Sequence, residues 1–238
     1  MIKLSVIIPC YNEEKNIPLI LERFSEVVKR SDIEIILVNN GSTDNSQEIL
    51  DRLLPKYPFA KTHFVETNQG YGHGILEGLA TAGGQYLGWT HADMQTDPKD
   101  IAKVIEIIEK ELGGSRDIFV KGERKGRPLS DNIFTLGMSL FESTLLGYKL
   151  WDINAQPTVF HRDFYDKWVM PPKDFSLDLF AYYYAKKLGL KIHRFNVQFP
   201  ERIHGTSSWN ISFKSKYKFI KRTVDFSFAL KKRLKVEK

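Results

Sequence analysis

The sequence contains a single cysteine, Cys10, and no long hydrophobic run. One cysteine cannot form a disulfide within the chain, which is typical of proteins that fold in a reducing compartment. A membrane-spanning helix needs about 20 consecutive apolar residues, and no segment approaches that length. Residues 1–9 are also too short and too strand-like for a signal peptide. We therefore expect a cytoplasmic protein that does not cross a membrane.

Most of the chain carries almost no net charge. The total is +6, but residues 211–238 hold ten Lys or Arg and two acids, a net +8 that leaves −2 for residues 1–210. The isoelectric point of about 9.2 therefore belongs to the C-terminal tail. With no base-stacking module in view, this charge does not predict a nucleic-acid partner.

Apolar residues recur at helical spacing between the basic residues of that tail, at Phe213, Tyr217, Ile220, Val224 and Phe228. An amphipathic basic helix suits an anionic membrane surface, but amphipathicity is equally typical of a helix packed on its own domain. Repeats, low-complexity segments and interdomain linkers are absent. We expect one domain over residues 1–210, followed by a basic amphipathic helix or tail over 211–238.

The first half alternates strand-like and helix-like segments. Buried strands are predicted at 4–8, 33–38, 62–66 and 85–90. Helices are predicted at 12–28, at 45–54, from the end of a loop at 68–74 through Ala82, and at 98–112. We expect Pro9 to end the first strand, and Asn12, Glu13 and Glu14 to cap the first helix. This order predicts an α/β fold with a Rossmann-like, mostly parallel sheet flanked by helices.

The pattern changes after residue 115. The sequence predicts a strand at 118–120, a polar basic loop at 121–131, a helix at 132–147, an extended segment at 152–160, a helix at 175–188, a strand at 190–199 and a loop at 201–209. We therefore expect the first half to bind a nucleotide and the second half to add the acceptor side of the same domain.

Residues 89–98, WTHADMQTDP, contain the most informative motif. They follow a predicted strand, and ligands bind at the carboxyl ends of strands in open α/β sheets. Alternate residues of an extended segment share one side, so His91, Asp93 and Gln95 can converge on a cation. These donors suit Mg²⁺ or Mn²⁺ held jointly with a diphosphate. A solvated strand end with a turn at 96–98 is the alternative.

A second motif is the glycine-rich loop after the third predicted strand, which contains Gly70, Gly72 and Gly74. Glycine permits a close backbone approach, and the helix that follows has an N-terminus that favours anions. The loop therefore predicts a phosphate contact, although glycines of a tight turn are equally expected. It follows the third strand rather than the first, so it is not a dinucleotide fingerprint.

Four motifs in order resemble the glycosyltransferases of family 2, which have the GT-A fold. Residues 6–14 (VIIPCYNEE) are similar to the family's opening segment, and 38–44 (VNNGSTD) to its Asp-Asp-Gly-Ser turn with Asn in both acidic positions. Residues 68–78 resemble the Asn-x-Gly…Gly helix entry, and 91–95 (HADMQ) the Asp-Ala-Asp-x-Gln motif with His in the first position. Within the family, the chain looks most like the dolichyl- and polyprenyl-phosphate sugar (mannose) synthases.

This resemblance implies a role for each motif. Pro9, Tyr11, Glu13, Asn40 and Gly70 would bind the nucleotide sugar, and Asn40 would accept a base N–H unless it only forms an Asx-turn. Asp93 and Gln95 would hold the divalent metal, as would His91 if it does not contact a phosphate or ribose directly.

The resemblance also implies an acceptor side. Arg124 and Arg127 in the basic loop would bind an acceptor phosphate, and Arg202 would face the diphosphate from the opposite side. Asp178 would be a general base for a hydroxyl acceptor, or would position a phosphate acceptor. Asp152 occupies the region that lines the donor sugar. Solvated charges, for the loop, and compensation of a helix dipole, for Asp178, are the alternatives.

Together these motifs predict an inverting hexosyltransferase that uses a divalent metal. The donor would be GDP-mannose or a UDP-hexose, and the acceptor a polyprenyl or dolichyl phosphate. We expect a peripheral protein on the cytoplasmic face of a membrane, held through residues 211–238 to an anionic surface or a membrane subunit. Two alternatives are a transferase acting on a sugar hydroxyl of a glycolipid or surface polysaccharide, and a degenerate nucleotide-sugar binder without activity.

Overall fold

A computed structural model describes residues 1–200, 203 and 213–236 of the chain. Its strands are β1 (Leu4–Cys10), β2 (Ile33–Asn40), β3 (Ala60–Val65), β4 (Tyr86–Trp89), β5 (Ile118–Lys125), β6 (Thr158–His161) and β7 (Lys191–Gln198). Its α-helices are α1 (Asn16–Val27), α2 (Ser46–Leu53), α3 (Tyr71–Thr81), α4 (Lys99–Glu106), α5 (Leu129–Leu146), α6 (Arg162–Tyr165), α7 (Leu177–Lys187) and α8 (Phe213–Val236). A π-helical turn, Ile107–Glu111, continues α4.

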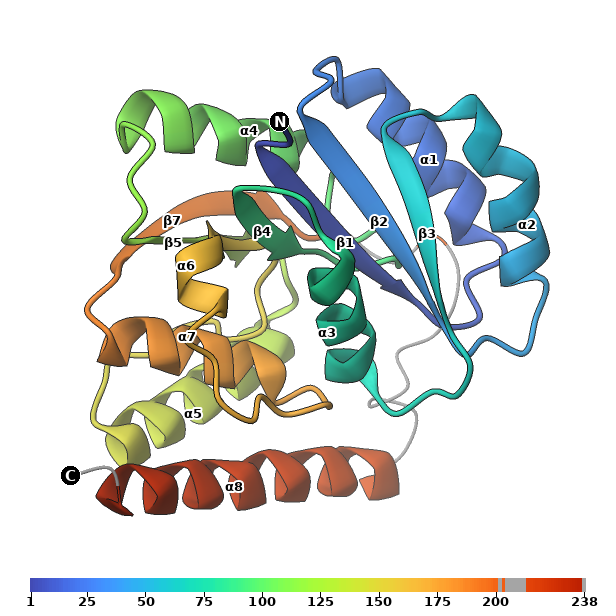
Figure 1. The fold of residues 1–238 in the computed structure, drawn as a ribbon. Helices are drawn as coiled ribbons and strands as arrows, with labels where there is room; N and C mark the ends of the chain where they lie inside the picture. Colours follow the sequence, from blue (N-terminus) through green and yellow to red (C-terminus); the bar gives the residue numbers. More distant parts are fainter. Residues whose placement is uncertain (201–202, 204–212, 237–238) are drawn as a thin grey trace.

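The strands form a seven-stranded sheet in the order β3-β2-β1-β4-β6-β5-β7 (Figure 1). β6 is antiparallel to its neighbours β4 and β5, and the other pairs are parallel. Two antiparallel steps restore the original direction, so β4 and β5 end at the same edge of the sheet. The predicted α/β fold with a mostly parallel sheet and a C-terminal helix is confirmed.

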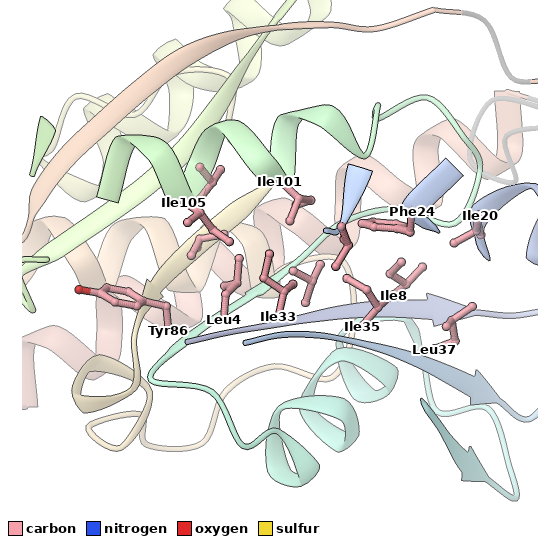
Figure 2. Packing of buried hydrophobic residues seen from close by; sticks show 14 of the residues in the cluster. Leu4, Ile8, Ile20, Phe24, Ile33, Ile35, Leu37, Tyr86, Ile101 and Ile105 are labelled. Carbon is pink, nitrogen blue, oxygen red and sulfur yellow. The ribbon is translucent and has the colours of Figure 1, made fainter. Parts of the chain in front are cut away.

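Alternation along β1 divides the core into two layers. Leu4 and Ile8 face a cluster with α1, α2 and α4, as Figure 2 shows for Phe24 of α1 and Ile101 of α4. Ile7 faces the other cluster, which includes residues of α3, α6 and α7. Two apolar layers on one sheet explain why the central strands are buried on both faces.

Strand β1 continues through Pro9 to Cys10, so the prediction that Pro9 ends the strand is wrong. The carbonyl of Ile7 accepts a hydrogen bond from Thr90 N (3.0 Å), on the β4 side. Pro9 lies two residues further and faces the same side, where β4 has already ended at Trp89. The missing N–H therefore costs no hydrogen bond of the sheet.

The predicted cap of the first helix is also wrong. α1 begins at Asn16 without a side-chain cap hydrogen bond. The side chain of Asn12 instead accepts from Thr43 N (2.8 Å), in the loop after β2. Asn12, which the local sequence pattern assigned to the helix cap, therefore forms a long-range hydrogen bond instead.

Two predicted segments differ in the second half. β5 extends to Lys125, into the predicted polar loop, because β7 pairs with it along its whole length. Residues 152–157 form bends and turns rather than a strand, and β6 begins at Thr158. The polar sequence at 121–125 predicted a loop, but pairing with the distant strand β7 makes this segment part of a β-strand.

Helix α8 lies alongside α5 (Figure 1) and packs against it. Ser227 Oγ donates to Glu142 Oε1 (2.7 Å), the rings of Phe141 and Phe228 are 6.3 Å apart, and Leu230 is buried in the second cluster. The C-terminal helix therefore uses part of its apolar face within the molecule. None of the helices described here is sufficiently long and apolar to cross a bilayer.

Candidate functional site

The loops that follow β1 and β2 are bound to each other at the carboxyl edge of the sheet. Asn12 N donates to Ser42 Oγ (3.0 Å), and Glu13 N donates to Ser46 Oγ (3.0 Å). Thr43 N donates back to Asn12 Oδ1. Reciprocal hydrogen bonds between two loops fix this part of the edge before any ligand is bound.

Three residues predicted to bind the nucleotide lie at the end of β1 or on the loop that follows it. Pro9 is partly buried, and the Tyr11 ring is 46% exposed. Glu13 accepts from Asn16 Nδ2 through Oε2 (2.6 Å), which fixes the carboxylate next to the start of α1. An exposed aromatic ring on a fixed loop can pack on a base or ribose.

The two asparagines at the end of β2 have different environments. Asn39 forms the Asx-type contact, since its Oδ1 accepts from Ser42 N (2.9 Å), while its amide donates to Gln47. Asn40 is 3% exposed and donates to the Gly70 carbonyl (3.0 Å). Within the described residues, Asn40 Oδ1 is buried without a hydrogen-bond partner. Asn40 therefore retains an acceptor of the kind expected for a base N–H.

The glycine-rich segment is packed against residues 172–174, and it is a loop only as far as Gly70, because α3 already begins at Tyr71. Gly70 has a φ of +121°, and a Cβ there would lie 2.6 Å from the Lys173 carbonyl oxygen. A Cβ on Gly72 would lie 2.6 Å from the Asp174 carbonyl oxygen. His73 N donates to the same Lys173 carbonyl (2.8 Å). Close packing of two backbones requires these glycines, which is the tight-turn alternative considered above.

The predicted metal motif follows β4. Asp93 is 9% exposed, and its Oδ1 accepts from Gln95 N (3.1 Å). Gln95 Nε2 donates to the Pro200 carbonyl (2.9 Å), which joins the motif to the end of β7. No group of three or more His, Cys, Asp or Glu side chains with a metal-binding arrangement occurs in residues 1–200, 203 and 213–236. One carboxylate is nevertheless enough for a Mg²⁺ or Mn²⁺ ion shared with a diphosphate, so the motif fits that kind of metal.

Tyr71 connects the glycine-rich loop with the metal motif. Its ring stacks on Phe175 (centroids 4.5 Å apart) and lies 5.8 Å from the His91 ring. Burial raises the pKa of the Tyr71 phenol, and the charges of Asp178 and Asp93 raise it further. Tyr71, His91, Asp93 and Asp178 therefore belong to one electrostatic environment.

Asp178 lies below this cluster and is only 1% exposed. Its Oδ1 accepts from Gln156 Nε2 (2.7 Å) and from Trp89 Nε1 (3.2 Å), and it lies 3.9 Å from Lys121 Nζ. Burial raises the pKa of Asp178, while the positive charge of Lys121 opposes that shift. The predicted general base is therefore a buried group with three side-chain partners.

Lys121 is the functional candidate that sequence reasoning missed. It is fully buried, donates to the Ala155 carbonyl (2.7 Å) and to Thr158 Oγ1 (2.9 Å), and burial lowers its pKa to about 7. We expected Lys121 in a solvated loop because it follows Val120, the last apolar residue of the predicted strand. Nothing in the local sequence marks this lysine as buried.

A basic cavity of about 210 Å³ lies at the end of β5. Arg124 donates to both oxygens of Asp152, through its side chain and its backbone N–H. The Arg127 side chain is 8% exposed and donates to Thr135 Oγ1 (2.8 Å), while its Nε is buried without a partner among the described residues. The lining holds three basic side chains and two acidic ones, and consists of Glu123, Arg124, Lys125, Gly126, Arg127, Asn132, Thr135, Trp151 and Asp152.

Residues with different predicted roles lie together in this cavity. Asp152, which was expected to line the donor sugar, accepts hydrogen bonds from Arg124 and lies 3.9 Å from Arg194. Arg127 keeps an unused N–H donor, which suits a phosphate oxygen. Arg202, predicted to clamp the diphosphate, lies outside the described residues.

The mostly parallel sheet flanked by helices, with its motifs at the carboxyl edge, is the fold of the GT-A class. The chain belongs to glycosyl transferase family 2, whose family model matches residues 5–169. The predicted family is thereby confirmed, and the chain is a glycosyltransferase.

The chain is similar to dolichyl-phosphate beta-glucosyltransferase of Dictyostelium discoideum, with 27% identity over 84% of this chain and 67% of that protein. It is also 34% identical to undecaprenyl-phosphate 4-deoxy-4-formamido-L-arabinose transferase of Yersinia enterocolitica, over 45% of this chain and 34% of that protein. The chain therefore matches about a third of the second relative's length and two thirds of the first.

The fold is similar to that of glucosyl-3-phosphoglycerate synthase from Mycobacterium tuberculosis, solved with Mn²⁺ and UDP-glucose. The TM-score is 0.72 at 17% identity, over 96% of this chain and 78% of that chain. At this level of identity the likeness shows the fold alone.

Proposed function

We propose that this chain is an inverting glycosyltransferase that moves a hexose from a nucleotide diphosphate sugar to a polyprenyl phosphate. The relatives named for dolichyl- and undecaprenyl-phosphate transfer support the acceptor class. The proposal depends on one observation: a site suited to a metal-bound diphosphate and a site suited to a phosphate lie at the same edge of the sheet. Asp93 follows β4, the basic cavity follows β5, and only β6 lies between these strands.

On the donor side, the Tyr11 ring packs on the base or ribose and Asn40 Oδ1 accepts a base N–H. Pro9, Glu13 and Gly70 shape the surrounding loops. Asp93 would hold Mg²⁺ or Mn²⁺, assisted by Gln95 and His91. When bound, the metal neutralises the charge that builds on the leaving diphosphate. The donor is GDP-mannose or a UDP-hexose.

On the acceptor side, Arg127 and Lys125 bind the lipid phosphate, and Arg124 is held in register by Asp152. A phosphate oxygen attacks the anomeric carbon on the face opposite the diphosphate. The new C–O bond forms as the old one breaks, so the configuration inverts. Because a phosphate is already ionised near neutral pH, no general base is needed. Asp178, bound to Trp89 and Gln156, positions the site and does not accept a proton.

The proposal also concerns where the chain works. Because a polyprenyl phosphate is a membrane lipid, we infer that the chain acts peripherally, at the cytoplasmic face of a membrane. An anionic lipid surface or a membrane subunit would hold it there. The division into a catalytic domain at 1–210 and a C-terminal helix or tail at 211–238 is part of the same proposal.

The test is isothermal titration of the full chain with GDP-mannose, UDP-glucose and UDP-N-acetylglucosamine, each with and without Mn²⁺. We expect one donor to bind, with at least about tenfold weaker binding when Mn²⁺ is omitted or Asp93 is changed to Ala. Asp163→Ala, an exposed aspartate on α6, is the matched control and should bind like the wild type.

Turnover is then measured with the bound donor and a short-chain polyprenyl phosphate in detergent. We expect product with the opposite anomeric configuration, and loss of turnover in Arg127→Ala with donor binding unchanged. Binding of a donor without transfer to any polyprenyl phosphate would overturn the acceptor assignment. Retained configuration would overturn the in-line mechanism.

A further inference from the structure

Helix α5 exposes a continuous apolar stripe. Leu129 is 75% exposed, Ile133 61%, Leu136 54% and Leu140 66%. Their spacing of four, three and four residues places them on one face of the helix. Large side chains gathered on one exposed face mark an interaction surface more often than scattered ones do. We call these four residues the α5 stripe.

The face that carries the α5 stripe has no exposed charge of its own. The charged residues of α5 are Asp131 and Glu142. Glu142 is buried under Ser227. Asp131, whose side chain is 41% exposed and 3.8 Å from Arg127, lies two residues from both Leu129 and Ile133 and therefore on the opposite face of the helix. The remaining exposed residues of the helix, Asn132, Gly137 and Thr144, are uncharged.

Basic residues are exposed near the stripe. Lys125, which is paired with Glu123 (2.6 Å), and Lys149 lie just beyond the two ends of α5. Helix α8, which packs against α5, exposes Lys232, Arg233 and Lys221, the last paired with Asp225 (2.6 Å). Phe228 of α8, 55% exposed, extends the apolar surface next to Phe141. An apolar centre with a basic rim is the pattern that anionic lipid surfaces attract.

We propose that the α5 stripe is inserted in the interfacial layer of an anionic phospholipid bilayer, with α5 lying in the membrane plane. This rests on the proposed function, whose acceptor is a membrane lipid. We favour a bilayer over a second copy of the chain as the partner. Two-fold pairing through the stripe would bring the basic residues of both copies together, and their like charges would repel. The stripe runs from Leu129 to Leu140, about 17 Å along the helix at 1.5 Å per residue, so its four residues contact the lipid along about two thirds of α5.

This orientation explains how a lipid reaches the basic cavity. Asn132 and Thr135 line that cavity, and each is followed directly by a stripe residue, Ile133 or Leu136. The cavity therefore opens within one helical turn of the membrane surface. A lipid phosphate enters it at the level of the head groups, and its hydrocarbon chain remains in the bilayer.

The α5 stripe adds to the surface that the sequence predicted. Of the tail's predicted apolar positions, Tyr217 and Phe228 are exposed (67% and 55%), whereas Val224 is partly buried. In this proposal α8 supplies basic charge, and α5, to which the sequence drew no attention, supplies most of the apolar contact.

Vesicle flotation of the full chain tests this inference, with phosphatidylcholine vesicles and with vesicles that also contain phosphatidylglycerol. We expect binding to the anionic vesicles at low salt, and roughly tenfold or weaker binding in Ile133→Ser/Leu140→Ser. The matched control is Phe64→Ser/Leu188→Ser, which removes two exposed apolar residues (55% and 40%) elsewhere and should bind like the wild type.

Equal vesicle binding of the stripe variant and the wild type would overturn the inference, as would failure of the wild type to bind anionic vesicles. A wild-type dimer in sedimentation that Ile133→Ser/Leu140→Ser converts to a monomer would assign the stripe to self-association instead. Turnover of a short-chain acceptor in detergent separates the two proposals. The stripe variant should keep it, whereas its absence in the wild type would count against the enzymatic assignment alone.

Discussion

At the scale of single residues, Lys121 and Asp178 hold together the strands that carry the candidate site. Lys121 lies on β5, Asp178 lies in the first turn of α7, and Trp89 ends β4 two residues before His91. Gln156 completes the contact from the turn before β6. Four elements thus meet at one buried carboxylate, and the loss of its counter-charge would affect all of them.

Removing one partner of a buried ion pair leaves an uncompensated charge. We expect Lys121→Met to lower the free energy of unfolding by about 3–5 kcal/mol, and Lys121→Met/Asp178→Asn to recover a large part of that loss. Urea denaturation measures both. Lys125→Met, on the same strand but 46% exposed, should change stability by less than about 0.5 kcal/mol. Equal losses in the single and double variants would show that the charges are not coupled.

Glycines provide a second residue-scale prediction, because a methyl group has opposite effects at two positions. At Gly72 a Cβ would lie 2.6 Å from the Asp174 carbonyl oxygen, whereas at Gly137 in α5 nothing lies within 4 Å. Gly72→Ala should destabilise the protein by about 1–3 kcal/mol. Gly137→Ala should stabilise it by about 0.5–1 kcal/mol. The midpoints of urea denaturation of the two variants and the wild type measure these changes. A stabilising Gly72→Ala would mean that the 172–174 loop does not pack as described.

At the scale of elements, a buried carboxyl joins α5 to α8. Glu142 of α5 is fully buried, and burial raises its pKa from 4.5 to about 7, although the Ser227 hydroxyl opposes the shift. Its Oε2 has no hydrogen-bond partner within the described residues. A neutral carboxyl therefore suits this contact better than a carboxylate.

The sign of the pH dependence follows from the raised pKa. Between pH 4.5 and about 7 the folded protein retains a proton on Glu142 that the unfolded chain has lost, so this contribution falls as pH rises. We expect it to decrease by about 3 kcal/mol across this window, and Glu142→Gln to remove the decrease. The measurement is urea unfolding of both proteins from pH 4.5 to 8.

The control for this prediction is Glu48→Gln, which changes an exposed glutamate in the first turn of α2. Its stability should follow the wild-type pH profile. If Glu142→Gln also follows that profile, Glu142 is not the group whose protonation supports the contact between α5 and α8.

At the scale of the whole molecule, positive charge is concentrated in the C-terminal segment. Residues 211–238 carry a net +8 against −2 for the rest of the chain. α8, which packs against α5, exposes Lys221, Lys232 and Arg233. Because Leu230 is buried in the core, removing residues 211–238 would expose apolar surface as well as remove charge. Point substitutions on α5 therefore test membrane contact more cleanly than truncation does.

The sequence by itself determined the family, the fold class and the order of the motifs. Hydrophobic periodicity and turn residues are local properties, so they place strands and helices correctly along most of residues 4–112. The motifs around Asp93 and Asn40 follow strands, and the carboxyl ends of parallel strands meet at one edge. Residues that act close to a strand end are therefore predictable from local pattern.

Only the tertiary structure decided which charges are buried and with what partners. Lys121, Gln156 and Asp178 are separated by 22 to 57 positions along the chain, and no local pattern relates them. The length of β5 depends on pairing with β7, the role of Gly70 and Gly72 on the backbone at 172–174, and the exposure of the α5 stripe on where α8 packs. Burial is a property of contacts between distant segments, and such contacts exist only once the chain has folded.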